Sequence, residues 1–366
     1  MLATFAPSPR IAFTQTKLIA RTVRPNHPVE RLNPLEQRHW DSQFAAQEDF
    51  SFFHGAAWAK VLAETYGHAP NYFTHDGELL PVMEISSPLT GKRGVALPFT
   101  DDCEPLCENA ESFKKLFDAA IAFGKARGWK FLEIRGGRKF LAEAAPSLSF
   151  YGHTLDLSSG EKNVFERFES STRRAIRKAE KEGVTVEITH RLDSLFSFYR
   201  LQCLTRKRHG LPPQPFTFFD NIHKYVLSRN AGFIALAKFK NTPIAAAVFF
   251  YSDGRAIFKF GASDESFQHL RGSNLAMWEG IKALAQHHRV KKLSFGKTSL
   301  ANDGLRKFKL GWGADEQRLE YFKFDLRRGK FVTDTDKCFG WHNRIFQSLP
   351  VPASRLIGKV LYRHMG

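Results

Sequence analysis

Hydrophobic positions recur at helical spacing between Ser158 and Gly183, and the rest of the chain falls into two α/β patterns on either side of this stretch. The apolar members are Val164, Phe165, Phe168, Ala175, Ile176 and Ala179. Their spacing predicts one helix over residues 158–183 with a single buried face. Ser158 with Glu161 predicts a capping box at its start, and Gly183 predicts the left-handed residue that ends it.

The segment before this helix predicts one small α/β unit. Two helices are expected within residues 34–68, with Trp58 in their core. The remaining expected elements are strands 71–75, 78–85, 95–99 and 130–135, and a helix over 110–127. The Asp76-Gly77 pair between the first two strands is a strong hairpin signal.

The segment after the helix repeats this pattern more clearly. The expected strands are 184–189, 233–239, 244–251, 256–262, 291–295 and 319–324, and the expected helices are 193–209, 216–228, 273–288 and 304–310. Antiparallel hairpins followed by a strand, a long helix and another strand predict a mixed sheet.

The length of 366 residues exceeds the size at which single cores usually stop growing, so we expect two domains of about 150 residues each. The predicted division is a loose basic tail over 1–30, domains over 31–157 and 158–318, and a C-terminal segment over 319–366. The tail contains Glu30 as its only acidic residue.

The net charge of +17 favours a polyanionic partner, which could be nucleic acid, an anionic membrane or a phosphorylated substrate. Five cations lie within nine residues of the central helix: Arg173, Arg174, Arg177, Lys178 and Lys181. They indicate either a solvated helix face or a surface for phosphate groups, and their spacing does not decide between the two.

Cysteine usage indicates a reducing compartment, which we take to be the cytoplasm. The four cysteines form no CxxC pair and show no ligand-like spacing with histidine. We therefore expect reduced thiols and no metal site.

An acidic loop follows the predicted strand 95–99 in this otherwise basic chain. Asp101, Asp102 and Glu104 could bind an ammonium or guanidinium group or a divalent cation, or could form a solvated loop.

No apolar run is long enough to span a bilayer, because the longest, Ile244 to Tyr251, is far too short. No signal peptide is visible. Residues 341–366 predict a basic amphipathic helix, which could lie on an anionic membrane or pack on the body of the protein.

Four blocks of sequence carry a family resemblance over roughly residues 53–366. They are TRRAIRKAEKEGV, TRKRHG, TPIAAAVFFYSDGRAIFKFGAS and FGKTSLANDGLRKFKLGWG. Together they resemble the Fem-type peptidyltransferases and the related acetyltransferase-like proteins of bacterial envelope-glycan and exopolysaccharide clusters. The resemblance implies an α/β (α+β) fold of two tandem GNAT-like domains with mixed sheets, whose C-terminal segment returns to the first domain.

The resemblance also implies acyl transfer to an amine. The donor would be an acyl-thioester such as acyl-CoA, or an aminoacyl-tRNA, and no cofactor would be tightly bound. The acceptor would be an amine on a glycan or peptide precursor. The phosphate-binding loop of coenzyme A enzymes is matched only in part, and Arg271, Gly272, Ser273 and Asn274 are the residues that could offer backbone amides to a pyrophosphate.

Aminolysis of an ester or thioester requires a route for the amine proton and stabilisation of a developing oxyanion. The resemblance assigns the oxyanion role to Lys309 of the Phe308-Lys309 pair. Asp303 is our expected proton acceptor. The alternatives are Asp264, Glu265 and a group of the substrate itself. The expected substrate-binding residues are Arg208, Lys297, Phe308, Asp101 and Asp102.

Two alternatives belong to other functional classes. One is a non-enzymatic RNA-binding protein, favoured by the charge and the arginine-rich helix, although no RNA-recognition motif is present. The other is a membrane-associated assembly protein that has kept the fold without the activity.

Overall fold

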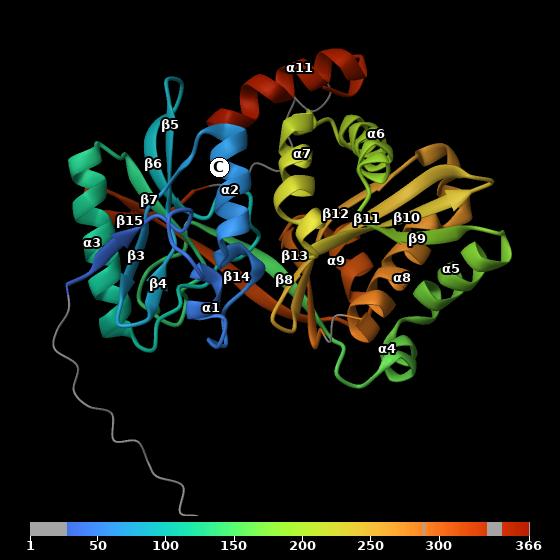
Figure 1. Ribbon diagram of the computed structural model, residues 1–366, viewed down its shortest axis with the longest axis horizontal. Helices are drawn as coiled ribbons and strands as arrows, with labels where there is room; N and C mark the ends of the chain where they lie inside the picture. The colour runs from blue at the N-terminus through green and yellow to red at the C-terminus, as the bar shows by residue number, and fades with distance from the viewer. Residues whose placement is uncertain (1–27, 288–289, 335–345, 366) are drawn as a thin grey trace, which may run out of the picture.

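The computed structural model describes residues 28–287, 290–334 and 346–365, and it has a mixed α/β fold. Figure 1 shows two halves side by side, with strands β8 (Leu148–Asp156) and β14 (Asp315–Asp325) running between them. The predicted fold class, two tandem GNAT-like units with mixed sheets, is confirmed.

One 12-stranded sheet extends through both halves in the order β2-β5-β6-β7-β14-β8-β13-β12-β11-β10-β9, with β15 paired to β14. Its first-half strands are β2 (Ala69–Pro70), β5 (Met83–Ser87), β6 (Gly91–Ala96) and β7 (Phe131–Arg135). Its second-half strands are β9 (Thr185–Thr189), β10 (Gly232–Phe239), β11 (Thr242–Ser252), β12 (Arg255–Ser263) and β13 (Lys292–Ser299). β15 is Lys330–Val332, and a small sheet contains β1 (Glu30–Leu32), β3 (Tyr72–His75) and β4 (Glu78–Leu80).

The two halves repeat one arrangement of strands and helix. In the first, the antiparallel pair β5–β6 is followed by α3 (Ala110–Arg127) and by β7, which lies parallel to β6. In the second, the antiparallel pair β11–β12 is followed by α8 (Gly272–His287) and by β13, which lies parallel to β12. Each parallel ladder contains three residue pairs. In the second half, β12 and β13 continue beyond their ladder without pairing to each other, which leaves an opening between them, whereas β6 ends with its ladder at Ala96.

β8 and β14 join the two halves. β8 pairs with β13 on one side and with β14 on the other, and the far end of β14 pairs with β7. The sequence pattern did not predict β8, whose ladder partners lie more than a hundred residues away. The expected return of the C-terminal segment to the first domain begins with β14.

The remaining helices cover the faces of the sheet. They are α1 (Trp40–Phe44), α2 (Ala56–Tyr66), α4 (Glu161–Arg167), α5 (Ser170–Lys181), α6 (Leu192–Arg208), α7 (Phe216–Tyr225), α9 (Asp303–Leu310) and α11 (Val351–Leu361). Trp58 on α2 is fully buried, as predicted, and contacts the rings of Phe218 on α7 and Phe250 on β11. The core therefore continues across the boundary between the halves.

The single helix predicted over 158–183 is wrong. The chain forms α4 and α5, separated at Phe168, whose backbone is extended. The buried Phe168 ring packs edge-on against Trp278 and Trp312, and the Glu169 amide donates to the carbonyl of Gly311. These tertiary contacts outweigh the local helical spacing.

The predicted helix ends have different outcomes. The capping box is wrong, because Ser158 bonds to Asp156 and the N-cap of α4 is Gly160. The prediction for Gly183 is confirmed by its left-handed φ of 80°.

Three further expectations are adjusted by the structure. The single strand predicted over 78–85 is two strands, β4 and β5, which belong to different sheets. Glu30, which was assigned to the loose tail, is the first residue of β1 and pairs with Thr74 of β3. The predicted C-terminal helix corresponds to α11, while residues 1–27, 335–345 and 366 lie outside the described part of the chain.

Candidate functional site

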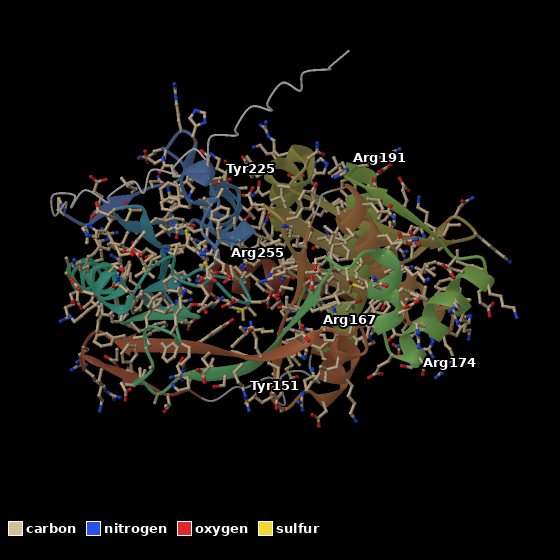
Figure 2. The ribbon with its side chains drawn as sticks, turned by 90° about the horizontal axis from the view of Figure 1, so that it is seen from below. Tyr151, Arg167, Arg174, Arg191, Tyr225 and Arg255 are labelled. Atoms are coloured by element: carbon tan, nitrogen blue, oxygen red, sulfur yellow. The ribbon has the colours of Figure 1, made fainter. Side chains whose placement is uncertain are left out.

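A cavity of about 810 Å³ lies between the two halves. Its first-half wall includes Asp49, Phe53, Asp102 and Glu104, and its second-half wall includes Arg255, Ile257 and Ser294. The joining strands contribute His153 from β8 and Gln317 from β14. Figure 2 shows Arg255 in the middle of the molecule, between the halves. Ile257 and Ser294 are the last pair of the β12–β13 ladder, so the cavity reaches the point at which these strands separate.

The acidic loop of the first half enters the opening between β12 and β13. Asp101 accepts a hydrogen bond from Nζ of Lys259 on β12 at 3.1 Å, and the same ammonium donates to the carbonyl of Phe99 at 2.7 Å. On the other side, a Cβ built on Gly296 of β13 would lie 2.9 Å from Cγ of Asp101. The glycine therefore allows the close approach of the Asp101 carboxylate.

Lys309, the predicted oxyanion stabiliser, is buried beside this opening and is 3% exposed. Its Nζ donates to the carbonyls of Gly296 at 3.0 Å and Lys297 at 2.9 Å. Both carbonyls belong to the irregular part of β13, where the β8 register shifts. Burial lowers the pKa of Lys309 to about 8, and the charge of Asp101 opposes that decrease.

Lys297 lies on the same strand and faces two aromatic rings. Its Nζ is 4.3 Å from the centroid of Phe150 and 4.6 Å from that of Tyr321, which is within cation–π range. Burial, together with the nearby Arg135 guanidinium, lowers the pKa of Lys297 to about 8, against the attraction of Asp101.

These side chains form a lysine cluster, which we define as Lys259, Lys297 and Lys309 around Asp101. Burial by itself would raise the pKa of Asp101, but the charges of Lys259, Lys297 and Lys309 outweigh it, so the pKa lies below its usual value. The cluster is thus built around an ionised carboxylate.

Asp102, the next residue, faces the cavity instead. Burial and the negative charges of Glu104 and Asp49 raise the pKa of Asp102 well above its usual value. Its Oδ1 atom is buried and has no hydrogen-bond partner among the described residues.

Glu104 supports the same wall of the cavity. Its Oε2 accepts a hydrogen bond from the Gly137 amide at 2.7 Å, and burial raises its pKa. Gly136 has a φ of 110°, and a Cβ there would lie 2.6 Å from Oε1 of Glu104. The two glycines let the backbone pass close to this carboxylate.

The other predicted catalytic residue, Asp303, lies apart from these groups. It is the exposed first residue of α9, whereas Lys309 is near the end of that helix. Six residues of helix separate their Cα atoms by about 9 Å along the axis. Asp303 does not line the interdomain cavity, and neither do Lys309, Lys297 and Asp101.

Phe308 and Arg208 also lie outside the cavity. Phe308 is 36% exposed on α9 and contacts Trp312 edge-on. Arg208, at the end of α6, lines a separate hollow of about 370 Å³ with Lys207, Ser263 and Asp264. Its Nη2 is 3.5 Å from Oγ of Ser263, the last residue of β12.

The predicted phosphate-binding residues form the start of α8. Arg271 has a left-handed φ of 58°, and its carbonyl accepts from the amides of Asn274 and Leu275. A Cβ on Gly272 would lie 2.8 Å from Ile244, so this glycine lets the helix approach β11 closely. The Arg271 amide donates to the carbonyl of Gln268, so of the four predicted residues only Gly272 and Ser273 have amides that no other described residue engages.

Sequence reasoning assigned no site role to Lys259. Lys259 lies in an alternating strand, where a charged residue normally faces solvent. Only the arrival of Asp101 from the other half makes it part of the site. Glu104 was predicted only as the third carboxylate of the acidic loop, without a separate role.

The described ranges contain no cluster of metal ligands. No group of three or more His, Cys, Asp or Glu residues in these ranges could hold a metal ion. Cys103, Cys107 and Cys203 are buried and not disulfide-bonded. Cys338 lies outside the described residues.

The second half of the chain contains a GNAT-type acyltransferase domain. Residues 166–323 match the family described as "Acetyltransferase (GNAT) domain". This match covers the second half, with the lysine cluster residues on β12, β13 and α9.

Solved structures show the same fold over most of the chain. A crystal structure of FemX superposes with a TM-score of 0.64 at 15% identity, covering 80% of this chain and 97% of that one. L-PGS from Bacillus licheniformis gives a TM-score of 0.50 at 13% identity, covering 88% and 95%. A conserved protein of unknown function from Bacteroides thetaiotaomicron gives 0.52 at 12%, covering 81% and 98%. No curated protein matches the chain in sequence.

Proposed function

We propose that the protein transfers an acyl or aminoacyl group from a thioester or an aminoacyl-tRNA to an amine held in the interdomain cavity. The observation that carries this proposal is the opposite orientation of two adjacent residues. Asp101 forms an ion pair with Lys259, while Asp102 lines the cavity. The three lysines do not line this cavity, so the proposal requires the acyl carbonyl to reach Lys309 past the loop that carries Asp101 and Asp102.

The proposed reaction joins the amine nitrogen to the acyl carbonyl carbon and breaks the bond from that carbon to the donor sulfur or oxygen. The raised pKa values of Asp102 and Glu104 suit these carboxylates to accept the amine proton, which the leaving group then takes up. Asp303 stays a prediction for the same role, but its exposed position favours the cavity carboxylates.

Lys309 is the proposed oxyanion stabiliser. Two of its three ammonium protons are fixed by the carbonyls of Gly296 and Lys297, which leaves one donor for the substrate. Its orientation is thus set before the substrate binds, as electrostatic catalysis requires. Lys297 is the second cation available for the acyl donor.

The donor is proposed to bind at the other end of the strand opening. Arg208 lines the hollow beside Ser263, and Arg271, Gly272, Ser273 and Asn274 form the start of α8 just after it. A helix N-terminus and an arginine together suit phosphate groups, which acyl-CoA and aminoacyl-tRNA both carry. Phe308 is proposed to contact the substrate from α9.

The proposed acceptor is an amine on a cell-envelope or exopolysaccharide precursor, and the proposed compartment is the cytoplasm, at the inner face of the membrane. The likeness in motifs to envelope-associated transferases supports this choice. None of the helices within the described ranges is long and apolar enough to cross a membrane. Contact with an anionic membrane would be peripheral.

The test is steady-state kinetics with acyl-CoA and aminoacyl-tRNA donors and a panel of amines. Lys309→Met should lower kcat by about 10²–10³-fold, the usual cost of losing one oxyanion donor. Asp102→Asn should raise KM for the amine more than it lowers kcat. Asp303→Asn is the matched carboxylate control outside the cavity and should keep its turnover. A kcat of Lys309→Met equal to that of the wild type would exclude the proposed role of Lys309.

The class of acyl donor is tested by a binding measurement that does not depend on catalysis. A donor that binds only the native state raises the melting temperature. The increase given by acyl-CoA or by aminoacyl-tRNA should fall in Arg208→Gln and persist in Lys309→Met. If neither donor raises the melting temperature of the wild-type protein, both donors are excluded.

A further inference from the structure

The large hydrophobic side chains that are at least half exposed gather at one edge of the molecule. Among the described residues there are five, and four of them lie together: Leu89 (70%), Leu356 (66%), Val360 (54%) and Met365 (50%). We call these four the apolar edge. The fifth, Phe196 on α6, is stacked on Phe216.

The apolar edge is one surface although its members are far apart in sequence. Leu89 is at the tip of the β5–β6 hairpin, and Met365 follows the turn that ends α11. His364 ties the two together, because its carbonyl accepts from Arg93 at 2.8 Å and its Nδ1 is 3.0 Å from Oγ of Ser87. Figure 1 shows the hairpin and α11 at the same end of the molecule.

α11 presents this surface because its inner face is small. Ser354 is buried, and a Cβ on Gly358 would lie 2.0 Å from the carbonyl of Pro213. Leu356 and Val360 are one turn apart on the opposite side. The helix therefore packs through its small residues and turns its large aliphatic ones outward.

Cations flank the apolar edge, and the two segments that form it contain no acidic residue. Lys359 and Arg363 fall on the same outer face of the helix as Leu356, and both are exposed. The sequence contains no Asp or Glu in 337–366, and none in 85–100 around the hairpin.

We propose that the apolar edge docks the protein on an anionic lipid bilayer, with Leu89, Leu356, Val360 and Met365 inserted among the acyl chains. Aliphatic side chains flanked by lysine and arginine are the composition of an interfacial helix. The cations would lie at the level of the anionic headgroups. The hairpin tip supplies a second point of insertion, which fixes the orientation of the whole protein.

Two other occupants fit the surface less well. A second copy related by a twofold axis would place Lys359 and Arg363 opposite the same cations. Single-stranded nucleic acid is held by aromatic stacking, which leucine, valine and methionine do not offer.

The test is co-sedimentation of the full chain with vesicles of phosphatidylcholine alone and of phosphatidylcholine with 30% phosphatidylglycerol. The protein should bind only the anionic vesicles. Lys359→Gln with Arg363→Gln should weaken binding roughly 30-fold, from about fivefold per cation. Leu356→Ser with Val360→Ser should weaken it at least tenfold, by about 0.8 kcal/mol for each methylene no longer buried.

Matched controls separate this surface from the general basic charge. Arg174→Gln with Arg177→Gln removes the same charge from α5, and Ile188→Ser removes an exposed aliphatic group from β9. Both should bind vesicles as the wild type does. Equal losses in the α5 and α11 charge variants would overturn the proposal, as would unchanged binding of Leu356→Ser with Val360→Ser. Dimerisation that depends on Leu356 in sedimentation velocity, without vesicle binding, would assign the surface to a second copy instead.

Discussion

The ammonium of Lys259 lies 3.1 Å from the carboxylate of Asp101, and this ion pair joins the second half of the protein to the first. Its side chains are only 7% and 22% exposed. Lys297 and Lys309 add positive charge around the same carboxylate. Asp101 is thus both part of the proposed site and a structural link across the sheet opening.

Loss of Asp101 should be costly. Asp101→Asn leaves Lys259 without its charge partner in a mostly buried position, and breaking such a pair typically costs about 3–5 kcal/mol. The control is Asp118→Asn, which breaks the exposed pair between Lys114 and Asp118 and should cost less than about 1 kcal/mol. Urea unfolding measures both. Equal effects would show that the Asp101 pair is no more than a surface salt bridge.

Gly296 should not tolerate a side chain. Its φ is 69°, and an added Cβ would lie 2.9 Å from Asp101. Gly67 provides the matched control, with a φ of 72° and no atom within 4 Å of its added Cβ. Both Gly→Ala changes carry the left-handed strain of about 1 kcal/mol. Gly296→Ala should be destabilised further and should lose transferase activity, whereas Gly67→Ala should keep it.

The lowered pKa of Lys309 predicts how stability changes with pH. The folded protein releases this proton near pH 8, whereas the unfolded chain keeps it until about pH 10.4. Between these values the unfolded state holds more protons, so the lysine makes the free energy of unfolding rise with pH, by up to about 1.4 kcal/mol per pH unit. Compared with Lys309→Met, the wild type should gain stability from pH 8 to pH 10. A constant difference between the two would contradict the lowered pKa.

Activity should respond to the same titration in the opposite sense. A cationic Lys309 stabilises an oxyanion, so its contribution to kcat should decline above about pH 8. Arginine stays charged throughout this range. The ratio of the Lys309→Arg rate to the wild-type rate should therefore increase with pH above 8. Lys297→Arg is the control, because the pKa of Lys297 is also about 8. Its ratio to the wild-type rate should change less with pH, since Lys309 is the proposed oxyanion donor.

The acidic side of the pH profile should report the cavity carboxylates. The pKa of Asp102 is raised by burial and by Glu104, and the ionised form is needed to bind the ammonium or accept its proton. Activity should therefore fall as the pH decreases through this raised value. Glu104→Gln removes one of the negative charges that raise it, so the acidic limb should move to lower pH. If Glu104→Gln leaves the acidic limb of the pH profile at the same pH, the charge of Glu104 does not raise the pKa that controls activity, which would contradict the prediction.

The sequence by itself determined the elements whose ends and spacing are local. The helix over 110–127 begins after Asn109, whose side chain accepts from the Ser112 amide, and ends at Gly128 with a left-handed φ of 74°. Such caps are encoded within a few residues, so the prediction and the structure agree there. The family resemblance likewise carried the fold class and pointed to Lys309, because its blocks are contiguous in sequence.

The tertiary structure alone decided which side chains form the site. Asp101 and Asp102 are neighbours of identical chemistry, and only the contact with Lys259, 158 residues away, turns one into an ion pair and leaves the other facing the cavity. β8 was missed and the helix at Phe168 was wrongly continued for the same physical reason. Ladder partners and packing partners distant in the chain outweigh local spacing, and no pattern within one segment contains them.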